Sequence, residues 1–271
     1  MKKSTLLIGF ALAIVTQAFA VDTDSIRYHH ENTDTTFVTE VINKTRTANI
    51  ESTAERIVYI AKMFLGKPYV AETLEGNPEM LTINTSELDC TTFVENVMAL
   101  AITTGEDTTT YKDFEKNLKS LRYRDGLIDG YASRLHYTSD WVADNSSRGN
   151  FTEVTSDCTH SEKKQIRLNY MSSHRKNYKG LTADQEAYDK IVEVEQKYNP
   201  ATYSYIPKTS VALKPVQNWL KEGDIILITT TTPGLDVTHM GIVVKHRGQL
   251  CIIHASTQAK KVVIEPQPLS N

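Results

Sequence analysis

The sequence predicts an α+β fold in which helices come first and an antiparallel sheet ends the chain. Apolar residues recur at helical spacing in several segments of the first two thirds of the chain, whereas the last seventy residues lose this period and contain short apolar runs typical of strands. No internal repeat and no linker rich in Gly, Ser or Pro divides the chain. We therefore expect one domain over residues 51–271.

Length and charge narrow the possible functions. The chain has 271 residues and a formal net charge of −3 at pH 7. This length is enough for a sizeable hydrophobic core. The small net charge and the lack of any long run of like charge argue against a nucleic-acid partner and against electrostatic attachment to a membrane surface.

The first twenty residues have the pattern of a Sec signal peptide. Lys2 and Lys3 precede an apolar run over 6–15, and Ala18-Phe19-Ala20 supplies a small-x-small cleavage pattern. We predict cleavage after Ala20, export to the periplasm or the cell exterior, and no stable membrane insertion afterwards. A retained N-terminal anchor is the alternative, although the apolar run is too short to span a bilayer comfortably.

Residues 21–50 are rich in Thr, Asp and Asn and lack a long apolar period. We expect them to form a mobile or loosely docked segment. Regular structure is expected from Ser52, which has capping-box spacing to Glu55, and the helix that it begins should stop at Gly66 and Pro68.

Further helices are expected after this first one. Helical spacing also predicts helices over 111–121, 161–173 and 182–198, the last opening with a capping box of Thr182 and Gln185.

Strands are expected at the end of the chain. The run "GDIILIT" at 223–229 is typical of a buried strand. Residues 238–256 predict a hairpin that turns at Arg247-Gly248, and a short strand over 261–265 can follow it.

Cys90 begins another predicted helix, because Cys90, Phe93, Val94, Val97 and Ala101 form one apolar stripe. A thiol in the first turn of a helix lies at the positive end of the helix dipole, which favours the nucleophilic thiolate. The competing interpretation is a small buried hydrophobe.

The chain has three cysteines, so at most one intramolecular disulfide can form. An exported compartment favours disulfides, and Cys158 with Cys251 is the natural pair if Cys90 is catalytic. The sequence itself leaves this pairing open. The preceding Asp89 is a candidate cap for the helix that Cys90 begins.

The predicted hairpin supplies candidate partners for this thiol. With a two-residue turn, His239, His254 and Ser256 point to one face of the sheet, and Cys251 points to the other. The two histidines become diagonal neighbours, as a base and the group that orients it would be. A loop one residue longer or shorter would place them on opposite faces.

Several motifs occur in the order typical of a known family: "GKPY", "LDCTTFVENVMAL", "GDIILITT", "GLDVTHMGIVV" and "IIHAS". The chain resembles the NlpC-type branch of the papain-like cysteine peptidases and, within it, the bacterial N-acetylmuramoyl-L-alanine amidase family. "GYASRLHYTSDW" and "YIPK" are also similar to that family. The resemblance covers approximately residue 53 to the end.

The resemblance implies a papain-like NlpC-type fold, with a helical N-terminal half that carries the nucleophile and packs on a C-terminal antiparallel β-sheet. It implies Cys90 as the nucleophile, His239 as the base and His254 as the orienting group. Tyr69 matches a tyrosine that helps to stabilise the oxyanion. Neither a metal nor an organic cofactor is implied.

The resemblance also suggests residues that recognise substrate. Ser133, Arg134, Asp140 and Trp141 lie where this family departs from other NlpC-type enzymes, and Ser256 shares the face of the two histidines. From the residues alone, Trp141 is more typical of a core and Arg134 of a surface ion pair.

The implied function is hydrolysis of the amide between N-acetylmuramic acid and L-alanine in peptidoglycan or muropeptides, by a monomeric enzyme. Two alternatives stay open: an endopeptidase that cuts the stem peptide between D-Glu and diaminopimelate, and a non-catalytic module that binds the cell wall. A zinc amidase would need a third ligand beside the two histidines, and the sequence identifies none.

Overall fold

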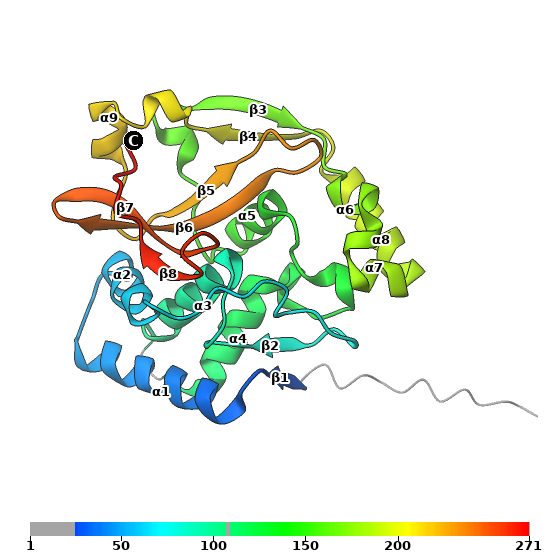
Figure 1. Ribbon diagram of the computed structural model, residues 1–271, viewed down its shortest axis with the longest axis horizontal. Helices are drawn as coiled ribbons and strands as arrows, with labels where there is room; N and C mark the ends of the chain where they lie inside the picture. The colour runs from blue at the N-terminus through cyan, green and yellow to red at the C-terminus, as the bar shows by residue number, and fades with distance from the viewer. Residues whose placement is uncertain (1–24, 107–108, 271) are drawn as a thin grey trace, which may run out of the picture.

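The computed structural model describes residues 25–106 and 109–270. The predicted signal peptide therefore lies outside the described residues. The architecture is α+β, as expected: a four-stranded antiparallel sheet of order β5-β6-β7-β8 packs on helices from the first half of the chain (Figure 1). Helices α2 and α3 contact the sheet directly, and α1 packs on the outer side of α2, α3 and α4.

The elements are bounded as follows. The helices are α1 (Glu31–Thr47), α2 (Thr53–Met63), α3 (Cys90–Thr103), α4 (Tyr111–Arg122), α5 (Thr138–Ser147), α6 (Tyr170–Ser173), α7 (Lys179–Ala183), α8 (Gln185–Lys197) and α9 (Lys214–Trp219). The strands are β1 (Ile26–Tyr28), β2 (Leu81–Ile83), β3 (Glu162–Ile166), β4 (Ala201–Tyr205), β5 (Ile225–Thr229), β6 (Val237–His246), β7 (Gln249–Ser256) and β8 (Lys261–Ile264).

Helix α3 is the centre of the core. Its apolar stripe is buried as predicted except for the half-buried Cys90, and α2, α4 and the sheet surround the helix. Asp89 caps it: the carboxylate accepts the backbone N–H of Thr92 at 2.8 Å, and the Thr92 hydroxyl accepts the N–H of Asp89 at 2.9 Å. The predicted cap is confirmed, and the first residue of α3 is fixed in place.

The hairpin has the predicted turn and register. His246 pairs with Gln249, and Arg247 and Gly248 both have positive φ (49° and 80°), which a two-residue turn that follows the twist of the strands requires. The short strand after the hairpin is also confirmed as β8.

Strands β6 and β7 separate at one end of the hairpin. Their paired residues end at Ile242 and Ile253. Beyond this point β6 stays paired with β5 through His239, and β7 stays paired with β8 through His254. His239 and His254 therefore lie beyond the last paired residues of β6 and β7.

The segment 21–50 differs from the expectation of a mobile arm. Its described part forms β1, which pairs with β2, and α1, whose Val38, Val41 and Ile42 belong to the main core. Asp34 of α1 is fully buried and accepts the backbone N–H and the hydroxyl of Thr85, both at 2.8 Å. The prediction was wrong because the few apolar residues of this helix are interspersed with threonines, so the sequence shows no long apolar period.

Two further elements differ from the prediction. The expected helix over 161–173 is instead β3, paired with β4, followed by the short α6. The expected capping box of Thr182 and Gln185 is replaced by Asp184, which accepts the N–H groups of Glu186 and Ala187 at 2.8 and 3.2 Å. Residues 161–166 alone have no strong strand pattern, and the pairing of β3 with the distant β4 makes this segment a strand.

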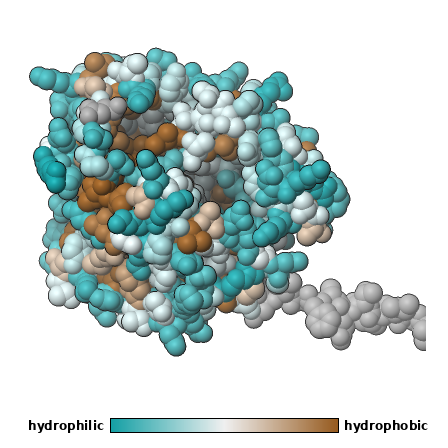
Figure 2. Space-filling model, viewed as in Figure 1, coloured by the Kyte–Doolittle hydropathy of each residue, from teal (hydrophilic) through white to brown (hydrophobic). Residues whose placement is uncertain are grey.

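Helices α6, α7 and α8 pack around a second, smaller hydrophobic cluster. It contains Tyr131, Ala132, Tyr137, Leu168, Met171, Leu181, Ala187 and Ile191. In Figure 2 apolar groups gather on the left, over the sheet and the helices beneath it, while the side of α6–α8 is mostly polar. Among the described residues, no helix combines the length and the apolar character needed to cross a bilayer.

Candidate functional site

The two predicted histidines meet where β6 and β7 separate. Nε2 of His239 lies 2.5 Å from Nδ1 of His254, and the ring centroids are 4.8 Å apart at an interplanar angle of 84°. The juxtaposition expected from the hairpin is therefore confirmed. A hydrogen bond of this length fixes the relative orientation of the two rings.

Burial holds both imidazoles in the neutral form. It lowers the pKa of His239 to about 4, and the neighbouring His254 adds to the effect. Burial also lowers the pKa of His254, against the opposing influence of the Glu265 carboxylate. At neutral pH His239 is therefore unprotonated on one ring nitrogen and able to accept a proton.

The hydrogen bond between the rings links their tautomers. One of the two facing nitrogens must donate and the other must accept. When Nε2 of His239 donates, its Nδ1 keeps the lone pair that a base requires. Nδ1 of His254 is then the acceptor, and Nε2 of His254 carries a proton toward Oε2 of Glu265 at 3.5 Å.

Cys90 is the first residue of α3 and is half-buried. Burial raises the pKa of its thiol, and the Asp89 carboxylate raises it further. Hydrogen bonds from the Met240 and Thr91 backbones and from the Thr91 hydroxyl act in the opposite direction. Because Met240 directly follows His239, this contact places the thiol against the part of β6 that carries the histidine.

Tyr69 lies in a loop fixed on both sides. Its backbone N–H donates to the carbonyl of Lys260 at 2.9 Å, and the N–H of Val70 donates to that of Leu88 at 3.1 Å. Burial raises the pKa of Tyr69 to about 12, with smaller contributions from the charges of Cys90 and Asp89. The phenol therefore stays protonated at neutral pH and can donate a hydrogen bond.

Arg134, a predicted substrate residue, is engaged inside the protein. It is only 7% exposed, and its guanidinium lies 2.8 Å from Oε1 of Glu75 and 3.2 Å from Oε1 of Glu79. Tyr123 also donates to Glu79 at 2.9 Å. Arg134 therefore serves a buried ion-pair network, which differs from the surface pair that its residue type suggested.

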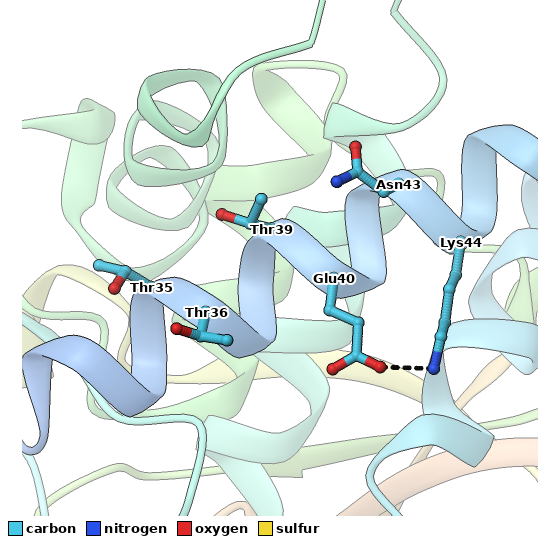
Figure 3. A pocket seen from close by; sticks show the side chains of 6 residues that line it. All are labelled: Thr35, Thr36, Thr39, Glu40, Asn43 and Lys44. Carbon is cyan, nitrogen blue, oxygen red and sulfur yellow. Dashed lines mark ion pairs between the residues drawn. The ribbon is translucent and has the colours of Figure 1, made fainter.

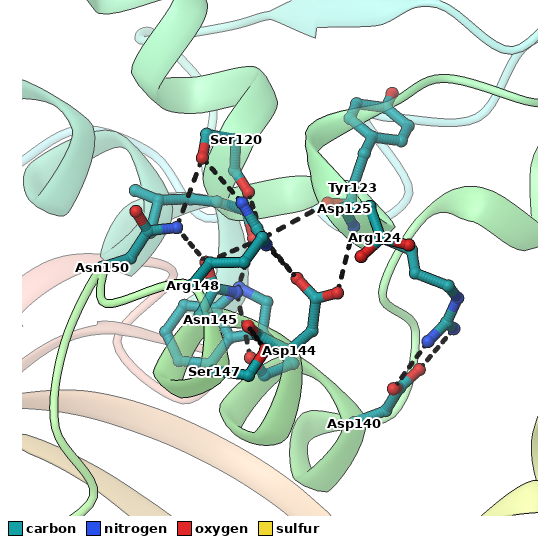
Figure 4. A network of polar contacts seen from close by, with 12 residues as sticks. Ser120, Tyr123, Arg124, Asp125, Asp140, Asp144, Asn145, Ser147, Arg148 and Asn150 are labelled. Atoms are coloured by element: carbon teal, nitrogen blue, oxygen red, sulfur yellow. Dashed lines mark hydrogen bonds and ion pairs between the residues drawn. The ribbon is translucent and has the colours of Figure 1, made fainter.

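Asp140 and Trp141 are likewise internal. The carboxylate of Asp140 is fully buried and binds both terminal nitrogens of Arg124, at 2.8 and 2.5 Å (Figure 4). Trp141 is 2% exposed, lies in the main core and packs on Phe151. These contacts favour supporting roles for both side chains, because neither faces the solvent.

The two predicted serines are also held by local contacts. The hydroxyl of Ser133 donates to the carbonyl of Gly130 at 2.7 Å and accepts the N–H of Asp129. The hydroxyl of Ser256, at the end of β7, accepts the N–H of Ala259 at 3.1 Å. Ser256 and His254 both belong to β7.

The sequence analysis did not identify Glu265 as a neighbour of His254. The register of β7 and β8 contains the signal: His254 pairs with Val263, and side-chain alternation places residue 265 on the same face as residues 254 and 263. The short strand after the hairpin was expected, but its pairing partners were not worked out.

All three cysteines are free thiols, and Cys158 and Cys251 are buried. Across the described ranges, no three His, Cys, Asp or Glu side chains are grouped so that they could hold a metal ion. A hollow on α1, lined by Thr35, Thr36, Thr39, Glu40, Asn43 and Lys44, contains none of the predicted site residues (Figure 3).

The chain is similar to several known proteins. Solved structures similar to the chain include an N-acetylmuramoyl-L-alanine amidase from Bacteroides uniformis ATCC 8492, at 41% identity and a TM-score of 0.74, covering 80% of this chain and 91% of that one. A Bacteroides fragilis protein, provisionally named a xylanase, is 41% identical with a TM-score of 0.73, covering 78% of this chain and 92% of its own.

A protein from Legionella pneumophila shares the fold at 22% identity, with a TM-score of 0.64 and 87% of each chain covered. No curated protein matches the chain. Residues 59–271 match the family described as "AmiA-like: N-acetylmuramoyl-L-alanine amidase-like". Because this match spans well over half of the chain, the protein belongs to the AmiA-like, N-acetylmuramoyl-L-alanine amidase-like family.

Proposed function

We propose that the protein is an exported amidase that hydrolyses the bond between N-acetylmuramic acid and L-alanine through a thioester on Cys90. The observation that carries the proposal is the 2.5 Å contact between His239 and His254, together with the contact of the Cys90 thiol with the backbone of Met240, the residue after His239. The family match and the named amidase among similar structures support the choice of bond.

The first step forms the thioester. Nδ1 of His239 takes the proton of the Cys90 thiol, and the sulfur attacks the lactyl carbonyl carbon of the muramoyl group. His254 holds the ring of His239 in the required orientation and shares the positive charge that develops. The tetrahedral intermediate collapses as His239 gives its proton to the leaving nitrogen, and the stem peptide departs as a free amine.

The second step releases the sugar. Water takes the place vacated by the stem peptide, His239 removes its proton, and the resulting hydroxide attacks the thioester carbon. The carbon–sulfur bond breaks, Cys90 regains its proton from His239, and the muramic acid leaves as a carboxylic acid that loses its proton to solvent. His239 carries each proton that moves to or from the sulfur, the leaving nitrogen and the attacking water.

Two donors are suited to the oxyanion of both intermediates. The backbone N–H of Cys90 lies at the start of α3, where helix N–H groups have no partner within the helix. The Tyr69 hydroxyl keeps its proton at neutral pH, as its raised pKa of about 12 requires. Donors in a partly desolvated site stabilise the transition state more than water does.

The predicted substrate residues take different parts in this proposal. Ser256 lies in the strand of His254, is 5% exposed and already accepts the N–H of Ala259, so we propose that it shapes the substrate site beside His254. Arg134 and Ser133 are proposed to shape the loop beside the site, because their polar atoms already bind internal partners. Asp140 and Trp141 are proposed to support that loop from inside the core.

We further propose the NlpC-type papain-like superfamily, removal of the segment 1–20 on export, and a monomeric enzyme that acts in the periplasm or outside the cell. These proposals rest on the sequence motifs and on the order of helices and sheet. They are consistent with peptidoglycan as the substrate.

A glycosidase is less well supported, despite the name of one similar structure. Most glycosidases need two carboxyl groups flanking the scissile bond. Around Cys90 the candidate groups are a thiol, two imidazoles and a phenol; the Asp89 carboxylate is occupied in capping α3, and the Glu265 carboxylate faces the His254 ring. These groups suit acyl transfer better than glycoside hydrolysis.

The proposal is tested with a defined disaccharide muropeptide and mass analysis of the products. Release of a free stem peptide beginning with L-Ala supports it, whereas a product that retains MurNAc-L-Ala favours the stem endopeptidase. Cys90→Ala should abolish turnover. Cys158→Ala, which removes another free thiol, is the matched control and should keep the activity.

A further inference from the structure

We propose that Glu265 is a positioning residue for the imidazole pair: its carboxylate accepts the Nε2 proton of His254 and thereby fixes the tautomers of both rings. This inference rests on the proposed function, in which His239 acts as the base. It adds a fourth member, contributed by the chain just beyond β8, to the set Cys90, His239 and His254.

The geometry places Glu265 at the end of a chain of polar groups. Oε2 of Glu265 lies 3.5 Å from Nε2 of His254, and Nδ1 of the same ring lies 2.5 Å from Nε2 of His239. Nε2 of His254 is buried and has no hydrogen-bond partner among the described residues, and the Glu265 carboxylate at 3.5 Å is an ion-pair contact that has not closed to a hydrogen bond. A buried ring N–H needs such a partner.

The backbone holds Glu265 in this place. Its N–H donates to the carbonyl of Ile252 at 2.8 Å, which continues the pairing of β7 with β8 by one residue. Further along, the N–H of Leu269 donates to the carbonyl of Leu250, also at 2.8 Å. The Glu265 side chain is 40% exposed, so it can rotate slightly and shorten the contact, as loosely spaced catalytic hydrogen bonds do when substrate binds.

The consequence for the reaction follows from the proton positions. With Glu265 as an acceptor, the proton of His254 stays on Nε2, and Nδ1 of His254 must accept from Nε2 of His239. His239 then has its free lone pair on Nδ1, as the proposed mechanism requires. Without the carboxylate, His254 can carry its proton on Nδ1 instead, which reverses the hydrogen bond and moves the lone pair of His239 to Nε2.

The test compares Glu265→Ala with Glu265→Gln, whose amide oxygen can still accept the proton. Glu193→Gln, an exposed glutamate of α8, is the matched control. We expect Glu265→Ala to lower kcat about fivefold or more at unchanged KM, and Glu265→Gln to keep at least half of the wild-type kcat, since a half-exposed hydrogen bond contributes modestly. Wild-type kcat in Glu265→Ala, or equal losses in both variants, would overturn the proposal.

A second measurement does not depend on the substrate. In protein labelled with ¹⁵N-histidine, the nitrogen chemical shifts at neutral pH should identify His254 as protonated on Nε2 in the wild type and as a mixture of tautomers in Glu265→Ala. Protonation of His254 on Nδ1 in the wild type would contradict the role of Glu265. Failure to cleave muropeptides would refute the proposed function while leaving this tautomer test valid.

Discussion

His239 and His254 are separated by fifteen residues along the chain, yet their nitrogens Nε2 and Nδ1 lie 2.5 Å apart. The contact arises because a two-residue turn sets the register of the hairpin, and because β6 and β7 then separate just before the two rings. The same strand brings Met240 against the thiol of Cys90. One hairpin thus supplies the base, its orienting partner and a contact to the nucleophile.

Replacing Tyr69 by Phe should lower kcat about 10²-fold, because loss of one oxyanion donor typically costs that much or more. The ring is kept, so the thermal midpoint should change little. Steady-state kinetics on a defined muropeptide checks this expectation. Wild-type kcat in Tyr69→Phe would remove the phenol from the mechanism.

Asp89 both caps α3 and raises the pKa of Cys90, and two variants separate these effects. Asp89→Asn keeps the cap but removes the charge, so alkylation of Cys90 at pH 7 should become about two- to fivefold faster. Asp89→Ala should also cost about 1 kcal/mol of unfolding free energy. The modified residue is identified by mass, and slower alkylation in Asp89→Asn would disprove the electrostatic part.

Helix α1 should be an integral part of the fold. Asp34→Ala removes the buried carboxylate that binds Thr85, and we expect a loss of about 2–3 kcal/mol in the free energy of unfolding. Glu40→Ala, at an exposed site on the same helix, is the control and should leave the stability nearly unchanged. Equal stability of the two variants in urea titrations would argue for a loosely docked helix.

His136 should make the fold sensitive to acid. Burial, aided by the charge of Arg134, lowers its pKa to about 3 from an ordinary value of 6.5. Because the folded-state pKa is lower, its contribution is complete above pH 6.5 and is lost as the pH falls. We expect His136 to account for about 2 kcal/mol of the stability lost between pH 7 and pH 5. Urea titrations of wild type and His136→Gln at both pH values would measure it; an equal loss in the two proteins would refute the assignment.

The sequence predicted the structure correctly where interactions between residues close in the chain determine it. The cap at Asp89, the helix from Cys90 and the turn at Arg247-Gly248 follow from side-chain chemistry and spacing. Side-chain alternation from the turn correctly placed His239 and His254 on one face of the sheet. It succeeded because the irregular pairing of β5 with β6 lies between Val237 and His239, outside the residues between His239 and the turn. A bulge between His239 and the turn would have placed the two histidines on opposite faces.

Contacts between distant segments were not predictable in this way. The pairing of β3 with β4 overrode helical spacing in 161–166, and the docking of α1 depends on Thr85, more than fifty residues away. The partner of Arg134 is an internal pair of glutamates from the loop before β2, which no local pattern reveals. Glu265 required the register of a strand whose partners were not worked out.

The central claim is a covalent intermediate on Cys90, and rapid quenching of the enzyme with a defined muropeptide, followed by peptide mapping by mass, tests it most directly. The account predicts that the peptide containing Cys90 gains the mass of the muramoyl sugar without any stem residue, and that Cys90→Ala gains nothing. An adduct that includes L-Ala and D-Glu, or turnover by Cys90→Ala, would contradict it.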